Sequence, residues 1–406
     1  MLEKRYVNRV EVENMDKKVI KREDWASSFY LVGTPIINDE YTYKINERSN
    51  KSNWVYNSLN LGVDCGSKAG IVYCELMGGY SEDNENRIFA HGKKDDGKDD
   101  YSKQIIVDWE DRFNDDVLEE IGDMSFITVG LERTNKRDVF KKKFLSAYDA
   151  IAYVNEHLTS DMVVFVRGNL KYSIYNDAVQ VKKNITSIEL SIDNKTKEYV
   201  TPDKYTARFT QSVLLDKDSA SLKDIDKDKG VMYVNARVLD YAKEINGIEV
   251  KGQYPFNKQF EFAMDFSKET DCKKIMDKLF KVKKGITQLT MEGEFVEGGA
   301  VVTATWDDVP DDIKDLVEMG IYDKEEALAK CTANGSRERR MVLKRPQIRL
   351  VGEDKVPVIS RFEERYTEED LTLDYLYDFN EVKDDEVSFD TGDGGSDDSM
   401  DWLNNL

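Results

Sequence analysis

Histidine and cysteine are scarce in this chain, which has two histidines and four cysteines among 406 residues. His91 and His157 leave little material for histidine-based catalysis or for a histidine-rich metal centre. The cysteines at positions 65, 74, 272 and 331 have neither CxxC nor zinc-ligand spacing. We therefore expect reduced thiols and a reducing cytoplasm.

Long hydrophobic runs and enzyme signatures are missing as well. No stretch approaches the length of a membrane span, and the polar N-terminus lacks the apolar core of a signal peptide. The sequence contains no Walker A, GxSxG or HExxH motif. Acidic pairs such as Asp95-Asp96 and Asp307-Asp308 could bind Mg²⁺, but acidic runs in polar connections are usually just solvated. We expect a cytoplasmic protein without enzyme activity, cofactor or metal, and keep a replication-associated nuclease as a second alternative.

The acidic charge is concentrated at the C-terminus. From Glu363 to Leu406 the chain has 16 acidic and two basic residues, so this segment carries −14 of the total charge of −21. Residues 1–362 then carry only −7. This acidic segment will repel nucleic acid and anionic lipid. Residues 1–362 can still present a basic groove if their basic side chains gather on one face.

A helix followed by a strand pair is the clearest local pattern. Apolar residues at helical spacing predict a helix over residues 144–158. Residues 161–192 then contain two apolar strand-like runs, separated by a polar turn at Asn176-Asp177, with Gly168 where a strand could bend. A helix before a strongly curved β-hairpin is how an OB barrel closes.

The same order of elements occurs twice along the chain. In the first copy, strands are predicted at residues 28–37, 54–63, 70–77 and 87–90, before the helix and hairpin. In the second, strands are predicted at residues 205–215, 231–239, 248–254 and 259–263, followed by a helix at 271–282 and strands at 287–296 and 340–351. Gly293 then aligns with Gly168. A spacing near 175 residues indicates domain duplication rather than a solenoid.

The predicted fold is mainly β with some α: two tandem OB-fold-like β-barrels, each with a helix before its last hairpin and an insertion, followed by a disordered acidic tail. The predicted domains are an N-terminal arm (1–25), a first barrel (26–195, insertion 93–143), a second barrel (203–352, insertion 300–336), a linker with a short helix (353–380) and the tail (381–406).

Candidates for nucleic-acid binding are aromatic side chains, which stack on bases, and Lys or Arg, which contact phosphates. In the first barrel they are Trp54, Tyr56, Tyr73, Phe89, Arg167, Tyr172, Tyr175, Lys182 and Lys183. In the second they are Arg208, Tyr233, Arg237, Tyr254, Phe260, Phe262, Arg337, Arg339, Arg340, Lys344 and Arg345. An aromatic residue on a strand is more often part of the core, and alternation alone does not tell which parity faces outward.

The end of the tail combines acidic and apolar residues. Its candidate partner-binding residues are Asp397, Asp398, Asp401, Trp402, Leu403 and Leu406. Such a segment can dock its apolar tip in a partner's pocket while its carboxylates meet a basic rim, or it can lie across its own basic groove and compete with DNA. A purely solubilising tail would leave Trp402 and Leu406 unexplained.

With these features the chain resembles single-stranded DNA-binding proteins of the kind encoded by bacteriophages. The segments Val-Arg-Gly-Asn-Leu-Lys-Tyr-Ser-Ile-Tyr (166–175) and Val-Gln-Val-Lys-Lys-Asn-Ile-Thr-Ser-Ile (179–188) are similar to the last hairpin of their OB folds. The resemblance implies sequence-independent binding of single-stranded DNA in replication or recombination, with the tail recruiting partner proteins. The tail lacks the Pro-Phe ending of bacterial relatives, so their partner's pocket is not carried over. The alternative is an OB-fold protein-interaction or virion-associated scaffold without DNA binding.

Overall fold

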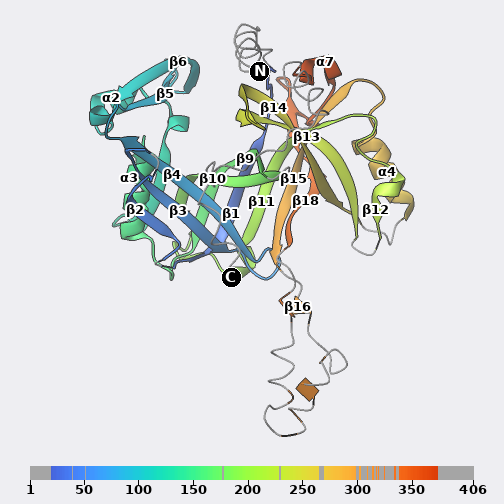
Figure 1. The fold of residues 1–406 in the computed structure, drawn as a ribbon, viewed down its shortest axis with the longest axis horizontal. Helices are drawn as coiled ribbons and strands as arrows, with labels where there is room; N and C mark the ends of the chain where they lie inside the picture. The colour runs from blue at the N-terminus through green and yellow to red at the C-terminus, as the bar shows by residue number, and fades with distance from the viewer. Residues whose placement is uncertain are drawn as a thin grey trace, which may run out of the picture.

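The computed structural model describes residues 20–373 apart from residues 39, 51, 176–177, 228–229, 265–268, 299–300 and most of 303–337. Within this part the chain is mainly β, as predicted, and most strands belong to one 15-stranded sheet (Figure 1). No helix among these residues is long and apolar enough to cross a membrane. The tail residues 381–406 and residues 1–19 of the arm lie outside the described part.

Five strands of the N-terminal half pair in a closed ring. They are β1 (Ser27–Ile36), β3 (Trp54–Asp64), β4 (Ile71–Ser81), β10 (Ala178–Leu190) and β9 (Val164–Tyr175), each paired with the next, and β9 pairs back to β1. Only the β4–β10 contact is parallel. This is the strand order of an OB-like barrel. We call it the first ring.

Helix α3 (Ala147–His157) directly precedes β9 in the sequence. It packs on β3 and β4 of the first ring. Its buried residues include Ala150, Ile151 and Val154, which join the main core. Ser146 caps the helix, because its hydroxyl accepts a hydrogen bond from the backbone N–H of Tyr148. The helix is therefore three residues shorter at its start than the predicted range.

A second ring of pairings has the same order. Its strands are β11 (Thr206–Leu215), β13 (Val231–Ile245), β14 (Ile248–Ala263), β18 (Glu338–Pro346) and β15 (Ile286–Gly298), and β15 pairs back to β11. The β14–β18 contact is again the parallel one. Helix α4 (Glu269–Leu279) lies between β14 and β15 in the sequence. The two strands predicted at 248–254 and 259–263 are in fact the single strand β14, because β13 continues to Ile245 and pairs with it throughout.

The insertion of the first ring carries a sheet of its own. Strands β5 (Arg87–Lys93) and β6 (Asp99–Asp108) pair with each other, and Figure 1 shows them with α2 (Asp115–Glu120) remote from the second ring. The predicted barrel strand at 87–90 therefore belongs to the insertion, because its partner is β6. A separate apolar cluster that includes Val107, Ile121 and Phe126 supports this sheet. After α2, β7 (Ile127–Arg133) pairs with β8 (Val139–Phe144). β7 also pairs in parallel with β10 of the first ring.

The segment expected to be a linker contains further strands. β20 (Val356–Ile359) forms a hairpin with β19 (Ile348–Val351), which is the end of the strand predicted at 340–351, and β21 (Arg361–Tyr366) pairs with β15 before α7 (Glu368–Leu371). Residues 20–25, which belong to the predicted N-terminal arm, pack against this region, since Arg365 binds Glu23 and Asp24 and Ile20 is buried. The remaining short elements are β2 (Tyr43–Arg48), β12 (Ile225–Asp226), β16 (Val301–Val302) and β17 (Ala333–Asn334).

The two rings join through the antiparallel pairing of β1 with β11. Phe29 lies directly opposite Phe209 in this pairing. Phe29 is also opposite Gly168 in β9, and Phe209 is opposite Gly293 in β15. The contacts around Phe29 thus recur around Phe209, as expected for a local twofold relation across the pairing.

Neither glycine leaves room for a side chain beside these phenylalanine rings. A Cβ atom on Gly293 would lie 2.2 Å from Cζ of Phe209, and one on Gly168 would lie 2.7 Å from Cε1 of Phe29. We predict that Gly293→Ala destabilises the fold by about 1–3 kcal/mol or more, because an added methyl in a filled core forces strain. Urea unfolding measures this change.

Gly252→Ala in β14 is the matched control, since its Cβ would meet no atom closer than 3.7 Å. Equal stability of the two alanine variants would show that the close approach of Phe209 to β15 is wrong.

Candidate nucleic-acid interface

The outward face of β3 and β4 carries a group of partly exposed aromatic side chains. Trp54 and Tyr56 stack with ring centroids 4.9 Å apart and ring planes 15° from parallel. Tyr73 lies opposite Gly62, and its ring covers that glycine, since a Cβ there would be only 3.1 Å from it. Flat aromatic surfaces on these strands are what an OB fold uses to stack bases.

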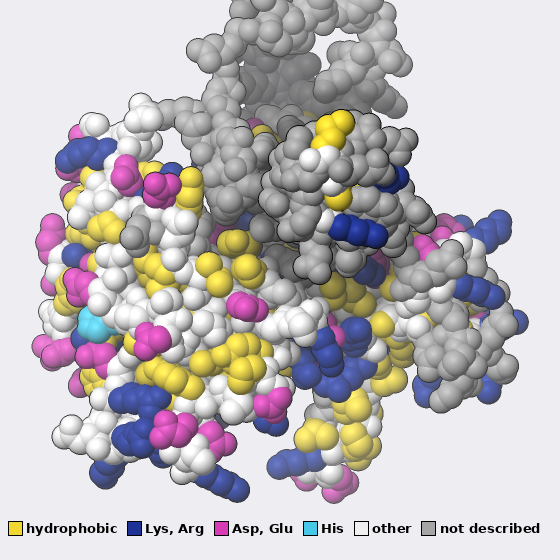
Figure 2. Space-filling model, turned by 90° about the horizontal axis from the view of Figure 1, so that it is seen from below, with side chains coloured by type: hydrophobic (Ala, Val, Ile, Leu, Met, Phe, Trp, Pro, Cys, Tyr) yellow, Lys and Arg dark blue, Asp and Glu magenta, His cyan; other side chains and the backbone are white. Residues whose placement is uncertain are grey.

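The β9–β10 hairpin carries basic side chains, one of which lies beside β4 of this aromatic face. Lys182 is exposed on β10, and its ammonium is 3.5 Å from the Glu75 carboxylate of β4. Arg167 on β9 is 3.0 Å from the carboxylate of Glu189. Tyr175 is exposed at the C-terminal end of β9. Seen from below, Lys and Arg side chains gather near the middle of the molecule (Figure 2).

The basic candidates on β11 and β18 are held by carboxylates of β15. Arg208 and Lys344 lie 4.0 and 3.6 Å from Glu294, and Arg345 lies 2.7 Å from Glu292. Arg340 pairs in the same way with Glu261 of β14. Exposed ion pairs of this kind contribute about 0–1 kcal/mol each. They are weak enough for a phosphate to replace the carboxylate, but each places a carboxylate beside a basic candidate.

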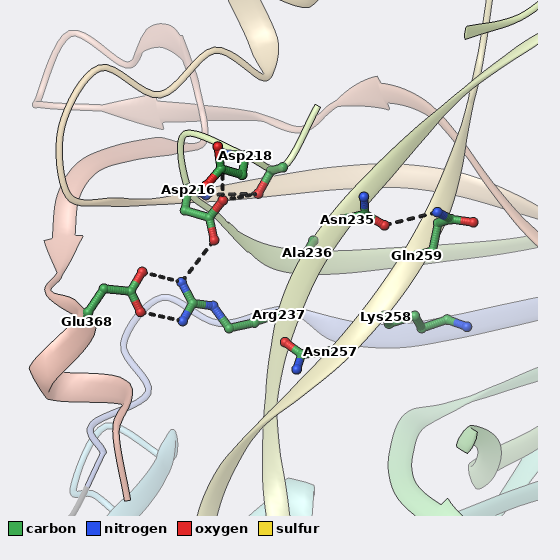
Figure 3. A pocket seen from close by; sticks show the side chains of 10 residues that line it. Asp216, Asp218, Asn235, Ala236, Arg237, Asn257, Lys258, Gln259 and Glu368 are labelled. Carbon is green, nitrogen blue, oxygen red and sulfur yellow. Dashed lines mark hydrogen bonds and ion pairs between the residues drawn. The ribbon is translucent and has the colours of Figure 1, made fainter. Parts of the chain in front are cut away.

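Arg237 lines a pocket of about 570 Å³ on β13 and β14 (Figure 3). Its guanidinium makes two hydrogen bonds to Glu368, at 2.7 and 2.9 Å, and one to Asp216 at 3.2 Å. Arg237 thereby ties α7 to β13, since a bidentate pair with a carboxylate is both strong and directional. Two carboxylates around it make this pocket a poor place for a phosphate.

The sequence profile of the YorF family matches residues 87–291, which run from β5 into β15. The chain belongs to the YorF family. No curated protein matches it.

Solved structures with some likeness to this YorF-family chain include the single-stranded DNA-binding protein from Thermus aquaticus. The wild-type structure has 10% sequence identity and a TM-score of 0.28, covering 67% of this chain and 86% of that chain. A deletion mutant of the same protein has 8% identity and a TM-score of 0.27, covering 70% of this chain and 89% of that chain. These scores are too low to support an inference about function.

Three aromatic candidates of this YorF-family chain are core residues, which corrects the sequence-based expectation. Tyr172, Phe260 and Phe262 are 4%, 1% and 4% exposed. The hydroxyl of Tyr172 donates to Gln211 Oε1 at 3.0 Å, and its backbone N–H donates to Asp240 at 2.8 Å. Burial, and then the charge of Asp240, raise the pKa of Tyr172. None of these rings can stack on a base.

The structure places further candidates in four different settings. Tyr233 and Tyr254 are partly exposed on β13 and β14. Phe89 is exposed, but it lies on β5 opposite Ile106, in the sheet of the insertion. Arg339 is described only by its backbone, which pairs with Glu297 in β15. Outside the described part lie Arg337 and the six tail candidates.

Sequence reasoning missed Lys258 in β14. The stretch 255–258 looked like a break between two strands, whereas β14 is continuous there and pairs with β13. Burial, and then the charge of Lys183, lower the pKa of Lys258. Its signal in the sequence is weak, because a lysine between Asn257 and Gln259 resembles any polar connection.

Metal ligands do not converge in the described residues, where no group of three or more His, Cys, Asp or Glu side chains could hold an ion. Asp95, Asp96, Asp99 and Asp100 belong to this part, whereas Asp307, Asp308, Asp311 and Asp312 lie outside it. Cys65, Cys74 and Cys272 are buried thiols.

The burial of Tyr172 predicts a loss of stability when its ring is removed. We expect Tyr172→Ala to lower the free energy of unfolding by about 3–5 kcal/mol, as for other large aromatic residues in cores. Tyr172→Phe removes only the hydrogen bond to Gln211 and should cost about 1 kcal/mol. Thermal and urea unfolding measure both.

Tyr175→Ala is the control, because Tyr175 is 47% exposed and exposed substitutions usually change stability by less than about 0.5 kcal/mol. If Tyr172→Ala were as stable as Tyr175→Ala, the placement of Tyr172 in the core would be wrong.

Proposed function

We propose that this chain is a sequence-independent single-stranded DNA-binding protein that acts in replication or recombination in the cytoplasm. The observation that carries the proposal is the aromatic face of Trp54, Tyr56 and Tyr73 on β3 and β4 of an OB-like ring. Every base has a flat face, so stacking on such rings does not depend on sequence. Lys182 and Lys183 lie on the neighbouring strand β10 and are suited to phosphate contacts.

The tandem arrangement of two OB-like domains, at 26–195 and 203–352, is part of the proposal. The two rings have the same strand order, the same single parallel closure and a helix before the fourth strand. The matching positions of Gly168 and Gly293 also support duplication. Two linked binding surfaces raise the affinity for a strand long enough to reach both.

The acidic tail is proposed to recruit replication or recombination proteins. Trp402, Leu403 and Leu406 would enter an apolar pocket of the partner, and Asp397, Asp398 and Asp401 would meet its basic rim. When no partner is bound, the same carboxylates compete with DNA for the basic side chains.

Removing the stacked pair tests the proposed binding face. We expect Trp54→Ala and Tyr56→Ala each to weaken binding of labelled oligo-dT by about 1–3 kcal/mol, the usual contribution of one stacked base. Fluorescence anisotropy at low salt gives the affinity, and its salt dependence tests for phosphate contacts, since their counterions are released on binding.

Phe89→Ala is the matched control, since Phe89 is an exposed aromatic residue outside the ring and its loss should leave the affinity unchanged. The proposed function is wrong if the unaltered protein fails to bind oligo-dT at low salt even after removal of residues 381–406.

Removal of residues 381–406 should tighten DNA binding. The tail carries many carboxylates, and their competition with DNA weakens as salt screens the charges. The gain should therefore be largest at low salt and shrink toward high salt. Replacing Asp393, Asp397, Asp398 and Asp401 together by Asn is the matched variant, and it should give part of the same gain. Equal affinity of the full and shortened chains would show that the tail does not compete.

A scaffold that binds polypeptide rather than DNA is the second candidate. The ion pairs of Arg208, Lys344 and Arg345 with Glu292 and Glu294 favour it, because these basic residues already have carboxylate partners. The residual charge of −7 on residues 1–362 points in the same direction. The anisotropy titration separates the two candidates, since a scaffold would show no salt-dependent binding of oligo-dT.

A further inference from the structure

The hairpin of β19 and β20 exposes an apolar face to solvent. These strands form a sheet of only two strands among the described residues. Ile348 and Leu350 of β19 are 64% and 63% exposed, although both are large aliphatic residues. They lie opposite Ile359 and Pro357, so all four side chains on this face are apolar. A hairpin of two strands is at best marginally stable in water, and a third strand stabilises it.

The free edge of this hairpin is that of β19. The backbone N–H of Ser360 donates to the carbonyl of the opposite Gln347 at 2.8 Å. Because hydrogen-bonded and non-hydrogen-bonded pairs alternate in an antiparallel ladder, the backbone groups of Leu350 and Pro357 then face outward. Proline has no N–H to donate, which blocks the outer edge of β20. The outer edge of β19 keeps its donors and can bind an extended segment as an added strand.

The N-terminal arm joins the described structure beside this hairpin. Arg365 of β21 binds Asp24 of the arm, with 2.9 Å between nitrogen and oxygen. The guanidinium groups of Arg365 and of Arg349 in β19 both lie over the Phe362 ring, at 4.3 and 4.5 Å from its centre. Contacts therefore lead from the arm to β19 through two side chains. The seven residues 13–19, which precede the described part, can span about 23 Å.

Residues 9–13 of the arm have a pattern that fits this edge. Arg-Val-Glu-Val-Glu alternates, so in a strand Val10 and Val12 lie on one face and Glu11 on the other. β19 alternates too, with its two exposed aliphatic side chains on one face and Arg349 on the other. No carboxylate of the described residues forms an ion pair with Arg349. Cross-strand neighbours interact, so one pairing serves both the valines and the glutamate.

We propose that residues 9–13 of the arm add a third strand to the free edge of β19 in the same chain. The added strand covers Ile348 and Leu350 with Val10 and Val12, and it places Glu11 beside Arg349. The occupant is the chain's own arm, because a segment tethered next to its site acts at a high effective concentration. This contact goes beyond the proposed function and does not depend on DNA binding.

Hydrogen exchange of the full chain tests the added strand. The amide of Leu350 faces the free edge, so an added strand should protect it in the unaltered protein. We expect Val10→Asp to speed its exchange about tenfold, because the variant loses an apolar contact and places a charge on an apolar face. Val7→Asp is the matched control, since Val7 lies outside residues 9–13 and its exchange for Asp should change nothing. Unchanged protection of β1 and β11 shows that the fold is intact.

A charge exchange tests the orientation of the added strand. Arg349→Glu places a second carboxylate beside Glu11, and Glu11→Lys places an ammonium beside Arg349. Like charges opposite each other destabilise a strand pair, so each variant alone should speed exchange at Leu350. The double variant, which restores opposite charges, should recover the protection.

Three results would overturn the proposal. The first is equal exchange at Leu350 in the unaltered protein, Val10→Asp and Val7→Asp. The second is a double charge variant that exchanges as fast as the single ones. The third is protection that disappears on dilution, since it would come from the arm of a second copy. None of these results bears on DNA binding, which the oligo-dT titration measures separately.

Discussion

The antiparallel pairing of β1 with β11 is the constraint on which the rest of the structure depends. It joins the two rings in one sheet and places Phe29 directly opposite Phe209. Each phenylalanine covers a glycine of the fourth strand in its own ring, Gly168 or Gly293. Because interiors are close-packed, these contacts leave the two rings little freedom to change their relative orientation.

Polar contacts at the same junction reinforce this pairing. Asp240 of β13 accepts a hydrogen bond from the backbone N–H of Tyr172 in β9, and the Tyr172 hydroxyl donates to Gln211 in β11. Asp240 is almost fully buried and also lies 3.4 Å from the ammonium of Lys171. Removing one member of such a network leaves the others buried without partners, which is why these residues are structural and not part of the binding surface.

The basic side chains of the described residues lie in two different environments. On the exposed strands, Arg208, Lys344 and Arg345 rest against Glu292 and Glu294, and such pairs form and break at little cost. At the junction, Lys183 and Lys258 lie against aromatic rings of the second ring's core.

The sequence by itself determined most strands, the helix before the fourth strand of each ring and the correspondence of Gly168 with Gly293. Alternation and turn residues are local, so they can be recognised without knowing the fold. It did not determine that residues 87–90 pair with β6, or that β14 is continuous through Lys258, because strand pairing joins residues far apart in the chain.

Only the tertiary structure decided which aromatic and basic side chains are available to a ligand. Trp54 and Tyr172 each lie on an alternating strand, yet the first is partly exposed and the second buried, since the pleat does not tell which face meets the core. Arg237 binds Glu368 on α7 and Asp216 just after β11, and both partners are likewise distant from it in the sequence. The contact between β10 and β14 also joins strands far apart in the chain, and no local pattern encodes it.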